Sequence, residues 1–329
     1  IFHRRALLTL ESERAPAAEC AFHALVALLD EPAFRYSVAA GGEAFAAYAA
    51  QEALGHLDTA RDVARQMQAR GEDVDDDLLS RLYRQRGLAL ELVQEDEAAQ
   101  ANYEEMRTVA VQRQDSALEL AALISQSNLH GTYTGVFDPP KARELAGVAL
   151  ARARELGDKA AEAGALWGLM VAEFFSGGDN DLIMAYGQQS LSLARELGLK
   201  ELTGRILNNL CWSFLAQKAP RQALAVLTEA QAIWRELGHR PRLGEATRFK
   251  LIIHYHVTAD YRSTLADAQE LAELGVSTGS RLDQLQALLF MVFVHARQGR
   301  FGKSQDYLEQ TGTLAASIGY SNEARAHEW

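Results

Sequence analysis

The sequence has few of the residues that cross-link or interrupt a chain. Only 2 cysteines and 6 prolines occur in 329 residues. Cys20 and Cys211 each lie in an apolar, helix-like context, so we expect two buried free thiols rather than a disulfide framework. No signal peptide and no apolar run of about 20 residues can be recognised. We therefore expect a cytoplasmic chain that does not enter a membrane.

Positive charge is also scarce. The 33 lysines and arginines are outnumbered by 44 aspartates and glutamates, which gives a net charge of −11. A nucleic-acid surface needs a basic stripe, and a site for an anionic membrane needs a block of Lys and Arg. Neither occurs, so the sequence predicts no direct nucleic-acid contact and no membrane contact.

Motifs for catalysis and for cofactor binding are missing as well. The segment 299–304, GRFGKS, has two residues between its first Gly and its Gly-Lys, whereas a phosphate-binding P-loop has four and follows a strand. No HExxH or CxxC occurs, and His254 and His256 are two residues apart, so they point to different faces of a helix. The acidic segment 72–77 lacks the spacing of a calcium loop. We expect a non-enzyme with no catalytic residues, no metal and no cofactor in this segment.

A phrase with the pattern of a helix end recurs instead, with a period near 40 residues. It closes, with spacings of 43, 43, 41, 40, 37 and 44 residues, at Gly71, Gln114, Gly157, Gly198, Gly238, Gly275 and Gly319. The unit that closes at Gly275 is short by about one helical turn. A fixed period with apolar residues at helical spacing predicts stacked hairpins. The expected fold is therefore all-α, a right-handed superhelix of about seven helical hairpins.

Each period divides into two helices separated by a turn. The predicted pairs are 38–53 with 57–70, 76–93 with 96–113, 115–129 with 139–156, 160–176 with 181–197, 200–216 with 220–237, 243–257 with 261–274, and 281–297 with 302–318. The third pair has the longest connection, HGTYTGVFDPP, which is either an interaction element or a plain insertion.

The pattern resembles the tetratricopeptide repeat family over residues 38–319. That family places a small residue on its first helix, which Gly87 matches, and small and aromatic residues on its second, which Ala99 and Tyr103 match. The first-helix slots of two further units are matched by Trp167, Met170, Val171 and Phe174, and by Leu207, Leu210, Cys211 and Phe214. The resemblance implies the fold and leaves the partner open.

The first 37 residues resemble a different segment, the one that joins an ATP-binding module to a repeat array. It occurs in LuxR-type transcriptional activators of the maltose-regulon activator class and in related multidomain signalling ATPases. The matching residues are His3, Arg4, Arg5, Ala18, Glu19, Ala21, His23 and Ala24. The resemblance implies that residues 1–37 are a helical linker after an absent ATP-binding module. Residues 38–329 would then be a repeat superhelix truncated at its C-terminus, with ATP bound only by the upstream module.

The first helices of the hairpins supply the candidate binding residues. On 200–216, Arg205, Asn208 and Trp212 form a stripe away from the expected core face, flanked by Asn209. Arg and Trp are frequent in binding hot spots. The equivalent slots elsewhere hold Phe175, Phe249, Ile253, His256, Leu289, Phe293 and Arg297. Groove aromatics and core aromatics share the same helical spacing, so both interpretations stay open here.

Two functions fit these features. In the first, the chain is a non-catalytic sensor domain of a multidomain transcription regulator, which binds an inducer or a partner protein in the groove and thereby controls an ATPase module. In the second, it is a stand-alone adaptor or scaffold that binds a peptide or a partner helix. An incomplete array has an apolar end face, so a homo-oligomer is a further possibility.

Overall fold

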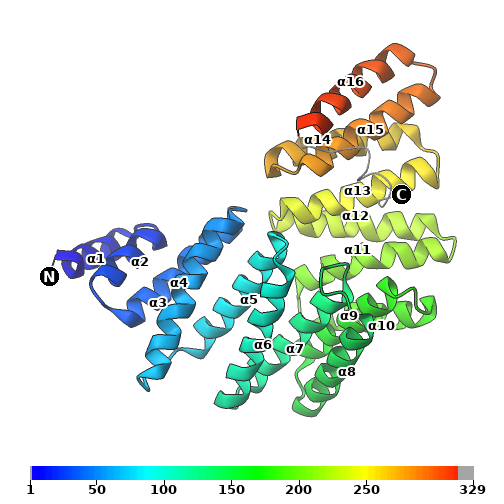
Figure 1. Ribbon diagram of the computed structural model, residues 1–329. Coiled ribbons are helices and arrows are strands. Elements are labelled where there is room, and N and C mark those ends of the chain that lie inside the picture. Colours follow the sequence, from blue (N-terminus) through cyan, green and yellow to red (C-terminus); the bar gives the residue numbers. More distant parts are fainter. Residues whose placement is uncertain (1, 318–329) are drawn as a thin grey trace. The chain divides into compact units, whose positions relative to one another are not determined.

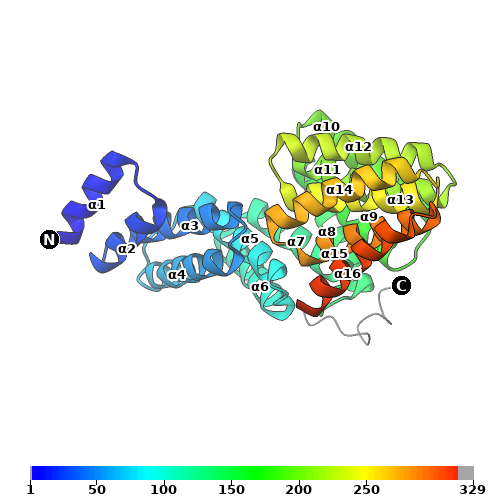
Figure 2. The same ribbon diagram turned by 90° about the horizontal axis from the view of Figure 1, so that it is seen from above.

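The computed structural model describes residues 2–317, and this part of the chain forms sixteen α-helices and no strand. The chain divides into two compact units, Ile1–Gly178 and Asp179–Trp329. Within each unit, consecutive helices pack against one another as hairpins (Figures 1 and 2). The predicted all-α class and its hairpin repeat are thus confirmed.

The helices have these bounds. Unit 1 contains α1 (Phe2–Glu13), α2 (Ala17–Val26), α3 (Asp30–Ala46), α4 (Ala50–Ala69), α5 (Asp76–Leu92), α6 (Asp96–Arg113), α7 (Ser116–Gly131), α8 (Pro139–Leu156) and α9 (Lys159–Phe175). Unit 2 contains α10 (Asn180–Glu196), α11 (Lys200–Ala216), α12 (Pro220–Glu236), α13 (Arg240–His256), α14 (Tyr261–Thr278), α15 (Arg281–Arg297) and α16 (Phe301–Ser317).

The recurring phrase ends a helix because its last residue adopts a left-handed backbone. Gly157 caps α8 with a φ of 70°, and Gly198 and Gly238 follow α10 and α12 with a φ of 66° each. Glycine enters this region without a Cβ clash, which is why it is common after helices. Gln114 occupies the same slot after α6 with a φ of 57°. The predicted repeat slot is therefore correct even where the glycine is missing. Gly319 and the segment 321–329 lie outside the described residues.

The first predicted hairpin, 38–53 with 57–70, is wrong in its bounds. Its helices are α3, which ends at Ala46, and α4, which starts at Ala50. The turn between them contains no glycine or proline, and Tyr48 takes the left-handed conformation with a φ of 62°. Residue 37, the predicted end of the linker, lies inside α3. Residues 2–26 form a hairpin of their own, α1 with α2, in which the Nδ1 atoms of His3 and His23 are 3.0 Å apart.

The short sixth unit is a second error. The helix α14 continues past Gly275 to Thr278, and Gly279 is the residue with positive φ, 73°. From Gly238 to Gly279 is 41 residues, so the period is unbroken. A Cβ on Gly275 would lie 2.8 Å from Gln284 Cγ and 2.9 Å from Gln284 N. Gly275 therefore allows α14 to approach α15 closely and does not end the helix.

Small residues on one helix of a hairpin accommodate large ones on the other. Gly87 lies beneath the Tyr103 ring, as the resemblance implies. Gly204 lies beneath Trp234, which is fully buried. Cys20 and Cys211 are both buried free thiols. In these two hairpins the missing side chain on the first helix makes room for an aromatic ring on the second, which allows close packing of the interior.

A ladder of ion pairs joins the second helices of successive hairpins. Arg235 of α12 pairs with Glu270 of α14, and Arg195 of α10 pairs with Glu229 of α12, at 2.5 and 2.6 Å. In unit 1, Arg65 of α4 makes the same contact with Glu105 of α6, at 2.8 Å. Counted from the start of each helix, the three arginines occupy the same position, and so do the three glutamates. In α10 and α12 this arginine belongs to the recurring phrase, so the phrase also links one repeat to the next.

Candidate functional site

The predicted residues of unit 2 lie on three neighbouring helices. These are α11, α13 and α15, the first helices of their hairpins, and α13 packs against both of the others (Figure 1). We call the surface that they share the first-helix face. Its polar part consists of Glu201, Arg205, Asn208, Arg242, Glu245, Arg248, Asp283 and Gln286. Its aromatic part consists of Trp212, Phe249, Tyr255, Phe290 and Phe293.

Polar contacts cross from helix to helix in the polar part. Asn208 Nδ2 on α11 donates to Glu245 Oε2 on α13 at 3.3 Å. Arg248 on α13 pairs with the buried Asp283 on α15, with 3.0 Å between Nη2 and Oδ1. Arg242 holds Glu245 at 2.9 Å. These contacts fix the side chains before any ligand arrives.

Four buried atoms of the polar part find no hydrogen-bond partner in the described part of the chain. One of them, Asp283 Oδ1, still has the ion-pair contact with Arg248. The other three are Asn208 Oδ1, Arg248 Nε and Gln286 Oε1. The orientation of the Asn208 amide follows from its neighbour, because its nitrogen faces the Glu245 carboxylate. A buried polar atom without a partner costs about 1–3 kcal/mol, so ordered water or a ligand must supply one. Successive helices thus offer an acceptor, a donor and an acceptor.

The aromatic part consists of two groups of rings, and the second packs against a core cluster of unit 2 that includes Phe290. Trp212 on α11 meets Phe249 on α13 edge to face, with ring centroids 5.1 Å apart. Tyr255 on α13 meets Phe290 on α15 at 5.3 Å and Phe293 at 6.0 Å. Trp212, Phe249 and Phe293 are half-buried, so each ring packs on its neighbour and still offers an edge to solvent. The packing and groove interpretations of these rings therefore both hold in part.

Charged groups flank the two parts. Arg205 pairs with Glu201 at 2.7 Å. Burial alone would raise the pKa of Glu201, but the charge and hydrogen bond of Arg205 outweigh it and hold that pKa below its ordinary value. His256 and Arg297 are exposed at the ends of α13 and α15. A hydrogen bond with Tyr255 raises the pKa of Arg297, so this guanidinium stays charged.

The structure brings most of the predicted residues together, with two exceptions. Phe175 belongs to unit 1, where its ring meets that of Tyr133 from the long α7–α8 connection at 5.0 Å. Ile253 is fully buried and is part of the core, so it offers no surface to a ligand. Sequence analysis missed Glu245 and Arg248, whose polar partners lie on other helices. Only their equivalence to Arg205 and Asn208 along the repeat marks them.

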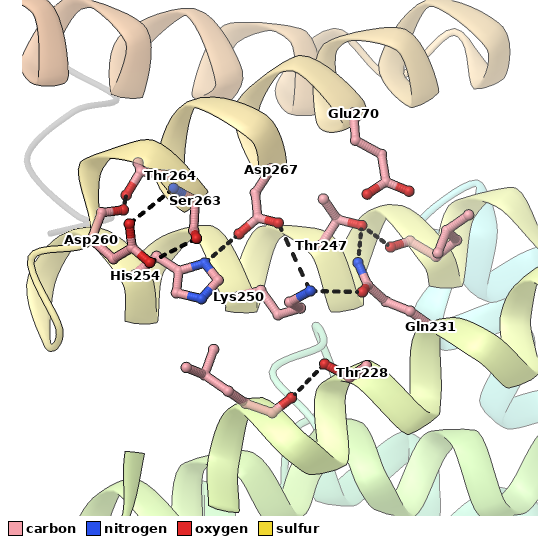
Figure 3. Close-up of polar contacts among 12 residues, drawn as sticks. Thr228, Gln231, Thr247, Lys250, His254, Asp260, Ser263, Thr264, Asp267 and Glu270 are labelled. Carbon is pink, nitrogen blue, oxygen red and sulfur yellow. Dashed lines mark hydrogen bonds and ion pairs between the residues drawn. The ribbon is translucent and has the colours of Figure 1, made fainter. Parts of the chain in front are cut away.

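A second polar cluster lies between α12, α13 and α14 (Figure 3). His254 Nδ1 is 2.6 Å from Asp267 Oδ2, and Lys250 Nζ is 3.9 Å from Asp267 Oδ1. Lys250 also donates to Gln231 Oε1 at 3.0 Å, and Gln231 donates to Thr247 Oγ1 at 2.8 Å. His254 points to this cluster while His256 is exposed, as their spacing predicts. Its charged side chains are mostly buried and paired with one another, so the cluster joins three helices.

Two further properties concern metals and membranes. Within residues 2–317, no three metal-ligating side chains come together as a possible metal site. None of the helices in that range combines the length and the apolar character that crossing a membrane requires.

Comparison with known proteins identifies the fold. No family model and no curated protein matches the chain. Among solved structures, it is similar to the quorum sensor NprR from B. thuringiensis, with a TM-score of 0.63 and 12% identity over 95% of this chain and 86% of that one. It is also similar to the Rap conjugation gene regulator of plasmid pLS20 in complex with the Phr* peptide, with a TM-score of 0.60 and 11% identity over 88% and 75% of the two chains.

A third similar structure is a signal transduction ATPase with numerous domains and a tetratricopeptide repeat sensor, from Pyrococcus horikoshii. Its TM-score is 0.60 and its identity 16%, and the match covers 99% of this chain and 53% of the ATPase. This chain therefore corresponds to about half the length of that protein. At such identities the three likenesses show the fold alone, which is a tetratricopeptide-like array of helical hairpins.

Proposed function

We propose that this chain is a non-catalytic sensor and interaction domain that binds an extended peptide segment across the first-helix face of unit 2. The observation that carries the proposal is the row of unpartnered buried atoms, Asn208 Oδ1, Arg248 Nε and Gln286 Oε1. They lie on three successive helices beside a row of half-buried aromatic rings.

The spacing of the helices suits a short extended peptide. Packed helices are about 8–10 Å apart, so three of them span about 16–20 Å. Five or six extended residues cover that length at about 3.3 Å each. Their main chain offers N–H groups to Asn208 and Gln286 and a carbonyl to Arg248. Side chains on one edge of the peptide then reach Trp212 and Phe293, where burial of apolar surface adds affinity.

We further propose that the chain serves a multidomain transcription regulator, in which ligand binding controls an ATPase module. Two observations support this: the N-terminal resemblance carried by His3 and His23, and the likeness to a signal transduction ATPase with a repeat sensor. A ligand acts in this way only if it prefers one state of the array over another. A small-molecule inducer would act through the same face. The alternative function is a stand-alone adaptor, for which the likeness to a regulator in complex with a peptide is equally good support.

Selection of random peptides of about ten residues on the purified protein tests the binding proposal. We expect Trp212→Ala and Asn208→Ala each to weaken a selected peptide by about tenfold or more, which is about 1.4 kcal/mol. Gln222→Ala, an exposed change on the second helix α12, is the matched control and leaves the affinity unchanged.

The thermal midpoint separates the two interpretations of Trp212. If Trp212 is part of a binding face, truncation to Ala weakens peptide binding and lowers Tm only slightly. If Trp212→Ala leaves peptide affinity intact and lowers Tm strongly, the ring is a packing element and the proposed face is wrong.

A further inference from the structure

The N-terminal hairpin brings two histidines together from a Phe-His dipeptide that occurs twice. The dipeptide stands at residues 2–3 and 22–23, and the hairpin places one copy on α1 and the other on α2. The Nδ1 atoms of His3 and His23 are 3.0 Å apart, whereas the ring centroids are 4.9 Å apart. The two imidazoles therefore meet through their Nδ1 edges rather than face to face.

Two phenylalanine rings hold this arrangement. Phe2 packs edge to face on His3 with centroids 5.4 Å apart, and Phe22 packs in the same way on His23 at 5.3 Å. Phe22 also meets His3 at 6.0 Å. Both imidazoles are half-buried. The histidine pair is thus positioned by aromatic packing as well as by its own contact.

The polar contacts of the pair are unlike those of other histidines in the chain. His254 and His56 each lie beside a carboxylate, at 2.6 and 4.0 Å. In the described part of the chain, the only hydrogen bond of His3 or His23 is the one between the two Nδ1 atoms. One Nδ1 must then donate a proton and the other must accept it. A metal ion can take the place of that proton and bind both nitrogens.

The separation of the two nitrogens is close to what zinc requires. Zn–N bonds are about 2.0–2.1 Å long, so a tetrahedral ion holds two nitrogens about 3.3 Å apart. The rings reach that distance by moving apart about 0.3 Å from their observed separation and turning both lone pairs to one point. Solvent reaches both rings, so water or the exposed Glu19, one helical turn before His23, can complete the coordination.

We propose that His3 and His23 form a two-histidine site for a divalent transition-metal ion such as Zn²⁺, which links α1 to α2. Only two protein ligands are in place, which is consistent with the lack of any group of three within residues 2–317. The site lies in unit 1 and does not rest on the proposed function.

A metal ion at this place would stabilise the start of α1. The one buried residue of that helix is Leu7. Near the other end, Glu11 accepts a hydrogen bond from Tyr36 of α3 at 2.7 Å. The other residues of the first turn are exposed, so the contact of His3 with His23 is what holds this turn to α2.

Calorimetric titration of the untagged chain with Zn²⁺ tests the site. We expect saturable binding that His3→Gln and His23→Gln each weaken by about tenfold or more, since even a partner outside the coordination shell is worth about 10–100-fold. His56→Gln is the matched control and leaves the affinity unchanged. His56 also has a glutamate one helical turn before it, Glu52, but the described part of the chain places no second imidazole beside it.

Hydrogen exchange of α1 in the native chain gives a second readout, which does not depend on how well a variant folds. An ion that binds only the closed hairpin slows its opening about tenfold when free Zn²⁺ is about ten times its Kd. Equal zinc affinity in the native chain and in both histidine variants would overturn the proposal. So would zinc binding that leaves exchange in α1 unchanged.

Discussion

The contact between Gly204 and Trp234 predicts a sign reversal in a simple substitution. Replacing a helical glycine by alanine normally stabilises a helix by about 1 kcal/mol. At Gly204 the new Cβ would lie 2.5, 2.7 and 2.9 Å from three carbons of the Trp234 ring. That ring is fully buried, so it cannot turn out into solvent without a cost. Overpacking of this kind costs about 1–3 kcal/mol, so we expect Gly204→Ala to destabilise the hairpin by about 1–2 kcal/mol.

Gly312→Ala is the matched control. It makes the same covalent change within a helix of the same unit, but nothing lies within 4 Å of the added Cβ. We expect it to stabilise α16 by about 0.5–1 kcal/mol. The two variants therefore differ in sign although their sequence contexts are both helical.

Hydrogen exchange of peptides from α11 and α12 is the suitable assay, because repeat arrays open locally rather than all at once. A loss of 1–2 kcal/mol corresponds to exchange about 5 to 30 times faster in these two helices. In a Trp234→Leu background the clash is removed, so the penalty of Gly204→Ala should largely disappear. The reasoning is refuted if Gly204→Ala slows exchange in α11 and α12 as Gly312→Ala does in α16.

Three further predictions follow from the contacts. Asp267→Ala leaves the Lys250 ammonium without its buried carboxylate, and we expect a loss of about 3–5 kcal/mol in the opening free energy of α13 and α14 by hydrogen exchange; an unchanged value would mean that the cluster is solvated. A double-mutant cycle on Arg235 and Glu270 should give a coupling below about 1 kcal/mol that shrinks with added salt, because both side chains are partly exposed. Burial raises the pKa of the Cys211 thiol, so this cysteine should react with a thiol reagent only after unfolding; rapid reaction of the native chain would contradict its burial.

The period of the array could be predicted because its signals are local. Glycine is strongly favoured at the left-handed position after a helix, so Gly157, Gly198 and Gly238 mark the helix ends in the sequence. The turns inside the hairpins carry no such signal. There Tyr48, like the residues at several equivalent turns, adopts positive φ without being glycine, and the cost is met by the packing of the two helices. The bounds of the first hairpin were wrong for this reason.

A glycine in this pattern can either end a helix or allow two helices to approach closely, and the sequence alone does not distinguish these roles. Gly238 ends a helix, whereas Gly275 lets two helices approach within a helix that continues. Both glycines close the same recurring phrase in the sequence. Only the contact of Gly275 with Gln284 in the structure distinguishes their roles. The misplaced unit boundary in the sixth repeat is the result.

The residues of the candidate site could likewise be predicted only in part. Equivalence along the repeat was enough to find Arg205, Asn208, Trp212 and Phe249, because each residue's helix and face follow from periodicity. It was not enough to exclude Ile253, which the structure buries fully.

The sequence by itself therefore determined the all-α class, the 40-residue period and the absence of the known catalytic motifs, all of which depend on residues close in the chain. Only the tertiary structure decided which polar atoms of the first-helix face find no partner within residues 2–317. This depends on distances between separate helices, and those distances are set by side-chain packing across the repeats rather than by spacing along the chain.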